Sequence, residues 1–255
     1  MTGKACLIFK AEKTGSTSRR PFLLADGRQG RGVLEWEKDE IEGRPPGRAV
    51  QREDSMDKKK MGIRVATAQD AAALLDIYRP YVEETAVSFE YETPSVQAFA
   101  ERVEAISGKY PFLAAEQDGR LLGYACATAF KERAAYDWAV ETTVYVRREA
   151  RGTGVGRGLY EALETCLAAQ NILNLNACIA VPEGEDPYLS MDSVAFHTRL
   201  GYRPVGVFHQ CGCKFDRWYN MLWMEKHIGA HQRNQPPVKA FAAVREALRA
   251  QYGLG

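Results

Sequence analysis

The sequence has no long hydrophobic run and no excess of charge of either sign. None of its apolar stretches approaches the about 18 residues that a membrane-spanning helix needs. The first apolar stretch, Cys6–Phe9, is shorter than the roughly 7–15 residues at the core of a secretory signal. Lysine and arginine number 34 against 33 aspartates and glutamates, which leaves a net charge of +1. This balance excludes a strongly basic nucleic-acid-binding protein, so we expect neither a membrane nor a nucleic acid as partner.

Cysteine is scarce and follows no metal-binding pattern, with 6 residues in a chain of 255. Cys211 and Cys213 flank one glycine near His209, but no second pair stands at ligand spacing. His227 and His231 lack the glutamate that follows the first histidine of a metalloprotease helix. A chain of this length buries a core without disulfides. We therefore expect no metal site, reduced thiols and a cytoplasmic location.

The first 60 residues differ from the rest of the chain. They hold 14 lysines and arginines against 10 acidic residues (+4), and the remaining residues hold 20 against 23 (−3). They show no sustained helical or strand period. Two interpretations stay open: a disordered extension, or residues upstream of a natural start at Met56 or Met61. We thus predict an extension over 1–60, a folded domain over 61–228, and a linker with a helix over 229–255.

Regular hydrophobic patterns begin at Met61 and alternate between strand and helix periods. Asp118-Gly119 is a hairpin signal, Pro80 predicts the end of the first helix, and Gly201 closes the fourth. The predicted strands cover 63–66, 111–116, 121–129, 138–146, 172–181, 203–209 and 218–225, and the predicted helices cover 67–79, 95–107, 154–169, 192–200 and 239–251. This order predicts an α/β domain with a mixed, mainly antiparallel sheet of about seven strands and helices on both faces.

A glycine-rich loop follows the fourth predicted strand and opens a helix. Glycines stand at 152, 154, 156 and 158, between Arg151 and Arg157 at either end of the loop. Successive main-chain N–H groups at a helix start bind anions, so the loop predicts a pyrophosphate site. No Gly-Lys-Ser/Thr follows, which excludes a Walker A loop. A dinucleotide fold would place the loop after its first strand, not past a hairpin.

The stretch Arg151-Gly-Thr-Gly-Val-Gly156 resembles the acetyl-CoA loop of the GNAT family of N-acetyltransferases. Three further segments, Ala135–Val146, Phe196–Tyr202 and Phe208–Tyr219, resemble the phosphinothricin and methionine sulfoximine acetyltransferase branch in order and spacing. The resemblance covers about residues 62–228. It implies the GNAT fold and transfer of an acetyl group from acetyl-CoA, without a metal, to the α-amine of a small amino acid or toxic analogue.

The resemblance also implies how acetyl-CoA is held. Ser193 would flank its pantetheine arm, although capping of its own helix is an alternative role for this serine. Asp192 stands where many relatives have asparagine, and a carboxylate cannot donate as an amide does. Main-chain groups would contact the arm from Val144, Tyr145 and Val146, and the pyrophosphate from Arg151, Gly152, Thr153, Gly154, Val155 and Gly156.

Two side chains are candidates for proton transfer. Glu141 lies in an otherwise apolar or β-branched strand, where partial desolvation would raise its pKa and suit it to accept the amine proton. The resemblance places the acidic base at Glu141 and a histidine near the sulfur at His197. The alternatives are an exposed strand glutamate and a structural histidine. The N–H of Val144 is a candidate donor to the oxyanion.

The acceptor side is predicted from two segments. Residues 87–91 lie between the first two helices, and residues 130–138 precede the Glu141 strand. Lys131 and Arg133 would hold a carboxylate, with solvated loop charges as the alternative. The aromatic candidates are Phe89, Tyr91, Tyr136 and Trp138, and core packing is the alternative for Phe89, Tyr136 and Trp138.

Two other functions remain open at this point. One is acetylation of a protein N-terminus or lysine, which would favour an open acidic groove. The other is a non-catalytic acyl-CoA-binding regulatory module, against which the presence of Glu141 argues. The predicted last helix has Val238, Phe241, Val244 and Leu248 at helical spacing, so we expect it to dock on the domain or a second subunit. The resemblance implies a homodimer.

Overall fold

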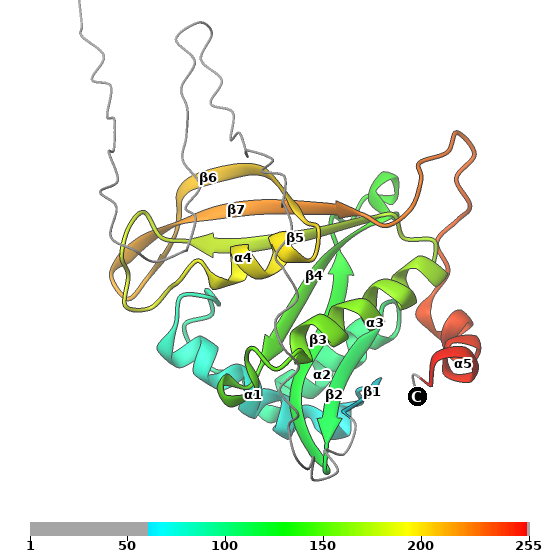
Figure 1. Ribbon diagram of the computed structural model, residues 1–255, viewed down its shortest axis with the longest axis horizontal. Helices are drawn as coiled ribbons and strands as arrows, with labels where there is room; N and C mark the ends of the chain where they lie inside the picture. The colour runs from blue at the N-terminus through cyan, green and yellow to red at the C-terminus, as the bar shows by residue number, and fades with distance from the viewer. Residues whose placement is uncertain (1–60, 254–255) are drawn as a thin grey trace, which may run out of the picture. The chain divides into compact units, whose positions relative to one another are not determined.

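The computed structural model describes residues 61–253, which form a seven-stranded sheet and five α-helices (Figure 1). The strands are β1 (Gly62–Val65), β2 (Phe112–Gln117), β3 (Arg120–Ala129), β4 (Ala139–Val146), β5 (Asn174–Val181), β6 (Arg203–Lys214) and β7 (Arg217–His227). The helices are α1 (Ala71–Glu84), α2 (Val96–Ser107), α3 (Val155–Ala169), α4 (Asp192–Arg199) and α5 (Phe241–Tyr252). Both interpretations of residues 1–60 concern residues outside the described part.

The strands lie in the order β1-β2-β3-β4-β5-β7-β6. All neighbours are antiparallel except β4 and β5, which are parallel. This arrangement confirms the predicted mixed, mainly antiparallel sheet. Asp118 and Gly119 turn β2 into β3 with φ of 52° and 75°, the two left-handed residues of a type I′ hairpin.

Helices cover both faces of the sheet, as predicted. On one face α1 and α2 bury Leu74, Leu75 and Phe99 against β2 and β3. On the other face α3, α4 and α5 form a second apolar cluster, with Leu159 and Leu163 at its centre. Figure 1 shows α3 crossing in front of β2 to β4. The sheet therefore separates two apolar clusters, one under α1 and α2 and one under α3, α4 and α5.

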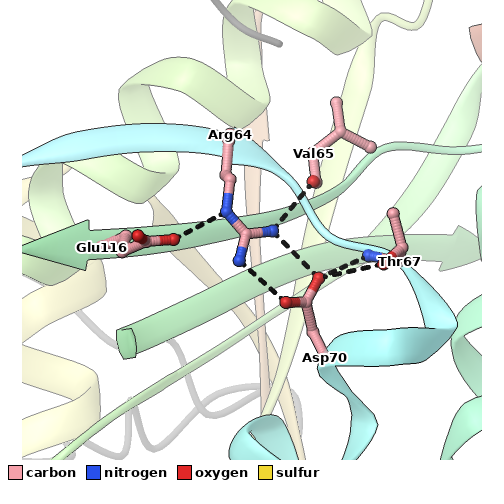
Figure 2. A network of polar contacts seen from close by, with 5 residues as sticks. All are labelled: Arg64, Val65, Thr67, Asp70 and Glu116. Atoms are coloured by element: carbon pink, nitrogen blue, oxygen red, sulfur yellow. Dashed lines mark hydrogen bonds and ion pairs between the residues drawn. The ribbon is translucent and has the colours of Figure 1, made fainter. Parts of the chain in front are cut away.

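Arg64 on β1 connects the first strand of the domain to β2 and to the turn before α1 (Figure 2). Its Nε donates to Glu116 on β2 at 2.8 Å, and its two terminal nitrogens donate to Asp70 at 2.9 and 2.7 Å. Asp70 also accepts from the main-chain N–H of Thr67 at 2.8 Å. The hydrogen bonds from Arg64 lower the pKa of Asp70. This fork of charged bonds joins two strands to the turn that leads into α1.

Two predicted boundaries were wrong. Pro80 does not end the first helix; it lies inside α1, which continues to Glu84. Tyr81 and Val82 just beyond it are buried, and this burial outweighs the hydrogen bond that the proline removes. The strand predicted to end at residue 209 continues to Lys214. The polar stretch 209–211 forms a bulge, since the β6–β7 register shifts between Phe208 and Gly212.

The C-terminal helix docks on the domain. Phe241, Val244 and Leu248 are buried in the same cluster as α3. The side-chain amide of Gln170 donates to the carbonyls of Lys109 and Lys239, both at 2.8 Å. The segment before α5 is thus held by specific polar contacts as well as by apolar burial. The boundary at residue 228 stays a prediction.

Candidate active site

The parallel strands β4 and β5 part inside the sheet. They pair only through Ala139–Glu141 and Asn174–Asn176, although β4 continues to Val146 and β5 to Val181. The side-chain amide of Asn176 donates to the carbonyl of Val140 at 3.1 Å. The hydroxyl of Thr142 donates to the carbonyl of Asn176 at 3.2 Å. Side chains therefore hold the two strands together at the last point before they separate.

The separation leaves part of the β4 main chain without a strand partner. At one end of β4 the carbonyl of Ala139 accepts from the N–H of Phe130, and just past the other end the N–H of Arg147 donates to the carbonyl of Leu122, so odd-numbered residues of β4 face β3. By the alternation of an antiparallel ladder, Thr142, Val144 and Val146 face the other way. The Tyr81 hydroxyl donates to the Val146 carbonyl at 2.5 Å and accepts from its N–H at 3.3 Å.

The main-chain groups predicted to contact the pantetheine arm therefore differ in availability. Val144 directs its N–H and carbonyl toward the opening between β4 and β5, as the prediction requires. The main-chain N–H and carbonyl of Tyr145 point toward β3. The N–H and carbonyl of Val146 are both bonded to the Tyr81 hydroxyl. For Tyr145 and Val146 the expected main-chain pairing does not fit this structure.

The glycine-rich loop leads directly from β4 into α3. Gly152 and Gly154 have φ of 75° and 97°, a conformation that side chains rarely adopt. Thr153 uses its hydroxyl on the carbonyl of Ala150 at 2.7 Å, so only its main chain is available to a ligand. Residues 151–154 are exposed, and α3 begins at Val155 with unpaired N–H groups in its first turn. The loop has the form of an anion-binding helix start.

Two further features of the loop concern packing. A Cβ on Gly156 would lie 3.2 Å from the ring of Phe196, so this glycine allows α3 to approach α4. The guanidinium carbon of Arg151 lies 5.0 Å from the ring centroid of Tyr81. Arg151 is exposed and carries its charge at the mouth of the loop. The predicted pyrophosphate site is thus assembled from residues that the structure brings together.

Glu141 stands at the end of the paired part of β4. It is half-buried, and burial raises its pKa while the positive charge of Lys131 opposes the shift. The Lys131 ammonium lies 4.9 Å from the ring centroid of Phe130 and 5.8 Å from that of Trp223. Trp223, which the sequence did not single out, therefore lies beside the candidate Lys131; its position in the alternating pattern of β7 was the available signal. Glu141 is chemically suited to accept a proton.

His197 is buried and both of its ring nitrogens are occupied. Nδ1 lies 2.7 Å from the carbonyl of Ser193, which only accepts, so Nδ1 carries the hydrogen. Nε2 then accepts from the hydroxyl of Tyr160 at 3.0 Å. Burial lowers the pKa of His197. The hydroxyl of Thr142 lies 3.4 Å from that of Tyr160 and 3.0 Å from that of Tyr202, so these groups form one network.

Glu141 and His197 lie on opposite sides of the sheet. Glu141 and Thr142 are consecutive in β4, so their side chains point to opposite faces. Tyr145 shares the face of Glu141 and packs against Tyr78 and Tyr81 of α1. Thr142 contacts Tyr160 of α3, which in turn contacts His197. The carboxylate therefore faces the α1–α2 side and the imidazole belongs to the α3–α4 side.

The predicted acceptor residues are divided among three places. Tyr136 is exposed and packs its ring on Phe130, 6.0 Å between centroids, near Lys131. Arg133 is exposed at the same loop. Trp138 instead donates from its indole to the carbonyl of Pro236 at 2.8 Å, so it anchors the C-terminal segment.

Phe89 and Tyr91 lie against the β6–β7 hairpin. Phe89 has its ring 6.1 Å from that of Tyr219, between centroids. Tyr91 donates to the carbonyl of Cys213 at 2.6 Å. The structure thus brings Lys131 and Tyr136 together and places Phe89 and Tyr91 in a second group.

The alternative role of Ser193 as a helix cap was wrong. The N-cap of α4 is Met191, and the first N–H of the helix, that of Asp192, donates to the hydroxyl of Ser190 at 3.3 Å. Ser193 lies one residue inside α4, half-buried, with its carbonyl bonded to His197. Its hydroxyl therefore stays a candidate contact for a ligand.

Two of the described cysteines, Cys126 on β3 and Cys178 on β5, lie within electrostatic range of Glu141. Burial raises the pKa of Cys126 and of Cys178 to about 12, so both are protonated thiols at neutral pH. Within residues 61–253, no three histidine, cysteine or acidic side chains converge as a metal site would require. The helices of the same region include none that is long and apolar enough to cross a membrane.

The fold and this constellation match one enzyme family. The model of the acetyltransferase (GNAT) domain matches residues 63–223. The chain therefore belongs to the GNAT acetyltransferase family, which confirms the predicted fold and the predicted N-acetyltransferase class.

Individual relatives are similar over nearly their whole length. The phosphinothricin N-acetyltransferase of Streptomyces viridochromogenes is 36% identical over 172 residues, which cover 68% of this chain and 90% of that protein. An L-methionine sulfoximine/L-methionine sulfone acetyltransferase of Salmonella typhimurium is 28% identical over 176 residues, covering 67% and 96%. The crystal structure of a GNAT superfamily phosphinothricin acetyltransferase from Sinorhizobium meliloti with acetyl-CoA superposes with a TM-score of 0.63. It is 29% identical and covers 71% of this chain and 98% of that one.

Proposed function

We propose that this enzyme transfers the acetyl group of acetyl-CoA to the α-amine of a small amino acid analogue such as phosphinothricin or methionine sulfoximine. The observation that carries the proposal is the half-buried Glu141, with a raised pKa, at the point where β4 and β5 part. The names of the relatives support the substrate class.

Acetyl-CoA fits the residues present on the α3–α4 side and at the opening. The loop 151–156 offers left-handed glycines and the free N–H groups of a helix start to the pyrophosphate. The main chain of Val144 offers one donor and one acceptor to the pantetheine arm, and Ser193 adds a hydroxyl. This loading of the loop and of Val144 is part of the proposal.

In the proposed reaction Glu141 accepts a proton from the acceptor ammonium. The free amine then attacks the thioester carbonyl, so that an N–C bond forms and the C–S bond breaks. The N–H of Val144 stabilises the negative charge that develops on the carbonyl oxygen. As the C–S bond breaks, the attacking nitrogen loses its second proton, which the leaving thiolate takes up as the thiol of coenzyme A, and the proton on Glu141 returns to solvent. His197, neutral and fully bonded, acts by holding Tyr160 and Thr142 in place.

Lys131 is the proposed partner of the acceptor carboxylate. Its ammonium lies over the ring of Phe130, and its charge opposes the rise in the pKa of Glu141 although the two groups form no ion pair. An anionic group bound by Lys131 would leave the amine of the same molecule directed at Glu141. Tyr136 and Phe89 would bound the side chain of the acceptor, and Arg133 and Tyr91 would lie at its solvent edge.

The test is a thiol-release assay with acetyl-CoA. The acceptors are phosphinothricin, methionine sulfoximine, methionine sulfone, the standard amino acids and an unrelated basic peptide. We expect turnover with the first three and none with the peptide. Acetyl-CoA binding measured by calorimetry without turnover of any small amine would refute the proposed substrate class. Turnover of the peptide alone would favour protein acetylation.

We also propose that the enzyme is a cytoplasmic homodimer. The edge strand β6 exposes Val205 and Phe208, each at 61%, and such an edge favours association. The five described cysteines are free thiols, which supports a reducing compartment. Sedimentation of the wild type and of Phe208→Lys tests the dimer. Equal masses at the size of one chain would refute it.

A further inference from the structure

Three consecutive residues of β6, Gly212 to Lys214, hold the loop that joins α1 to α2. The ammonium of Lys214 donates to the carbonyl of Val82 in the last turn of α1 and to that of Ser88, both at 2.6 Å. The carbonyl of Cys213 accepts from the Tyr91 hydroxyl at 2.6 Å. We call Gly212–Lys214 the latch. It reaches residues 82–91 across more than a hundred positions of sequence.

Gly212 makes the third contact of the latch, because its lack of a side chain leaves room for the ring of Phe89. A Cβ at this position would lie 1.9 Å from Cε2 of Phe89 and 2.5 Å from Cζ. The Phe89 ring therefore occupies the volume that any other residue would fill. Gly206, on the same strand, has no atom within 4 Å of its hypothetical Cβ and serves as a matched control.

Lys214 works as a charged tie to the main chain. Its side chain is buried, with the residue 2% exposed, and within residues 61–253 its hydrogen-bond partners are main-chain carbonyls and not a carboxylate. Burial lowers its pKa, while the charge of Glu90 opposes that shift. The carbonyls at a helix C-terminus lack helical partners and attract a cation, which Lys214 supplies at the end of α1. Lys214 therefore fixes the C-terminal end of α1 and the main chain at Ser88.

The loop held by the latch lies on the side of the sheet that carries Glu141. Phe89 packs in one cluster with Ala180 of β5. Positions 176, 178 and 180 alternate onto one face, and Asn176 pairs with Glu141. Ala180 belongs to the part of β5 that has separated from β4. Phe89 is thus placed beside the opening, on the side where the acceptor amine would meet Glu141.

We propose that the latch is a specificity-determining element, in which Gly212 and Lys214 are positioning residues that set Phe89 as a wall of the acceptor site. This inference rests on the proposed function, because it assigns the acceptor to the Glu141 side. Gly212 contacts Phe89 and no residue of the glycine-rich loop, so we expect it to govern the affinity for the acceptor and not for acetyl-CoA.

The first test compares Gly212→Ala with Gly206→Ala. Gly212→Ala forces the Phe89 ring out of its place, so we expect the KM for the acceptor to rise about tenfold, as for a misplaced substrate contact. The dissociation constant of acetyl-CoA, measured by calorimetry, should stay within about twofold of wild type. Gly206→Ala should change neither quantity. An unchanged acceptor KM in Gly212→Ala, or an equal loss of acetyl-CoA affinity, would overturn the proposal.

The second test uses Lys214→Met and Lys214→Arg with hydrogen exchange of residues 85–92. Lys214→Met removes the donors and should raise both the exchange rate of this loop and the acceptor KM. Lys214→Arg keeps a cationic donor and should restore part of each. Unchanged exchange in Lys214→Met would overturn the latch itself. If the wild type acetylates no small amine while exchange still responds, the proposed function fails and the latch as a structural tie stands.

Discussion

Replacement of Glu141 by glutamine is the sharpest test of the proposed chemistry. In the described residues the Glu141 carboxylate makes no hydrogen bond or ion pair, so an amide of the same shape loses only the long-range attraction to Lys131. The substitution also removes a charge that burial disfavours. We therefore expect Tm to stay the same or rise, and a fall in activity then reports on chemistry and not on folding.

The expected loss follows from the role of a general base. A positioned base contributes about 10²- to 10⁴-fold, so kcat of Glu141→Gln should fall by about that factor, or about 3–5 kcal/mol of barrier. The affinity for acetyl-CoA should not change, because its proposed contacts are the main chain of Val144 and the loop 151–156. Initial rates in the thiol-release assay and calorimetric titration measure the two quantities.

The pH dependence supplies an independent check. Burial raises the pKa of Glu141, so kcat/KM of the wild type should increase with pH through a value above the ordinary glutamate range. That limb should be absent in Glu141→Gln. A loss of acetyl-CoA affinity that matches the loss of kcat, or an unchanged acidic limb in the variant, would refute the assignment of Glu141 as the base.

Three further substitutions test other parts of the structure. Thr142→Val keeps the β-branched shape but loses the hydroxyl that bonds Asn176, so it should lower stability by about 1–2 kcal/mol in urea unfolding, and Thr142→Ser should restore most of it. Arg64 lowers the pKa of Asp70, so the stabilisation from this pair is present above about pH 4 and is lost as the pH falls through the lowered pKa. The difference in unfolding free energy between wild type and Asp70→Asn should therefore shrink at low pH. A difference independent of pH would contradict this reasoning. Gly154→Ala forces alanine to φ of 97°, so it should weaken acetyl-CoA binding, whereas unchanged calorimetric affinity would exclude the loop from the site.

Most of the fold could be predicted because its signals are local. The I′ turn at Asp118-Gly119, the glycine that closes α4 and the alternation along β4 each depend on neighbouring residues. The errors arose where distant burial decided the outcome. Pro80 stays inside α1 because the residues after it are buried in the core, which no local rule reveals.

The candidate site was predictable as a set of residues but not as an arrangement. The motif of residues 151–156 identified the anion loop, and the isolated charge of Glu141 in an apolar strand identified the acid. That His197 is linked to Thr142, and so lies behind the sheet from Glu141, depends on how α3 and α4 pack. The contact of Tyr81 with Val146 joins residues 65 positions apart, and only the folded chain brings them together.

The pairing of β4 and β5 ends at Glu141 and Asn176, which leaves a stretch of β4 main chain between the two faces of the sheet without a strand partner. In the proposed reaction the acetyl donor binds from the α3–α4 face of the sheet and the amine from the Glu141 face. Neither substrate therefore has to leave before the second one binds. The protonated thiols of Cys126 and Cys178 offer no intermediate carrier for the acyl group. The kinetic order that follows is a ternary complex with direct transfer, visible as intersecting double-reciprocal lines when both substrates are varied. Parallel lines would mean that the acetyl group is first transferred to a group of the protein.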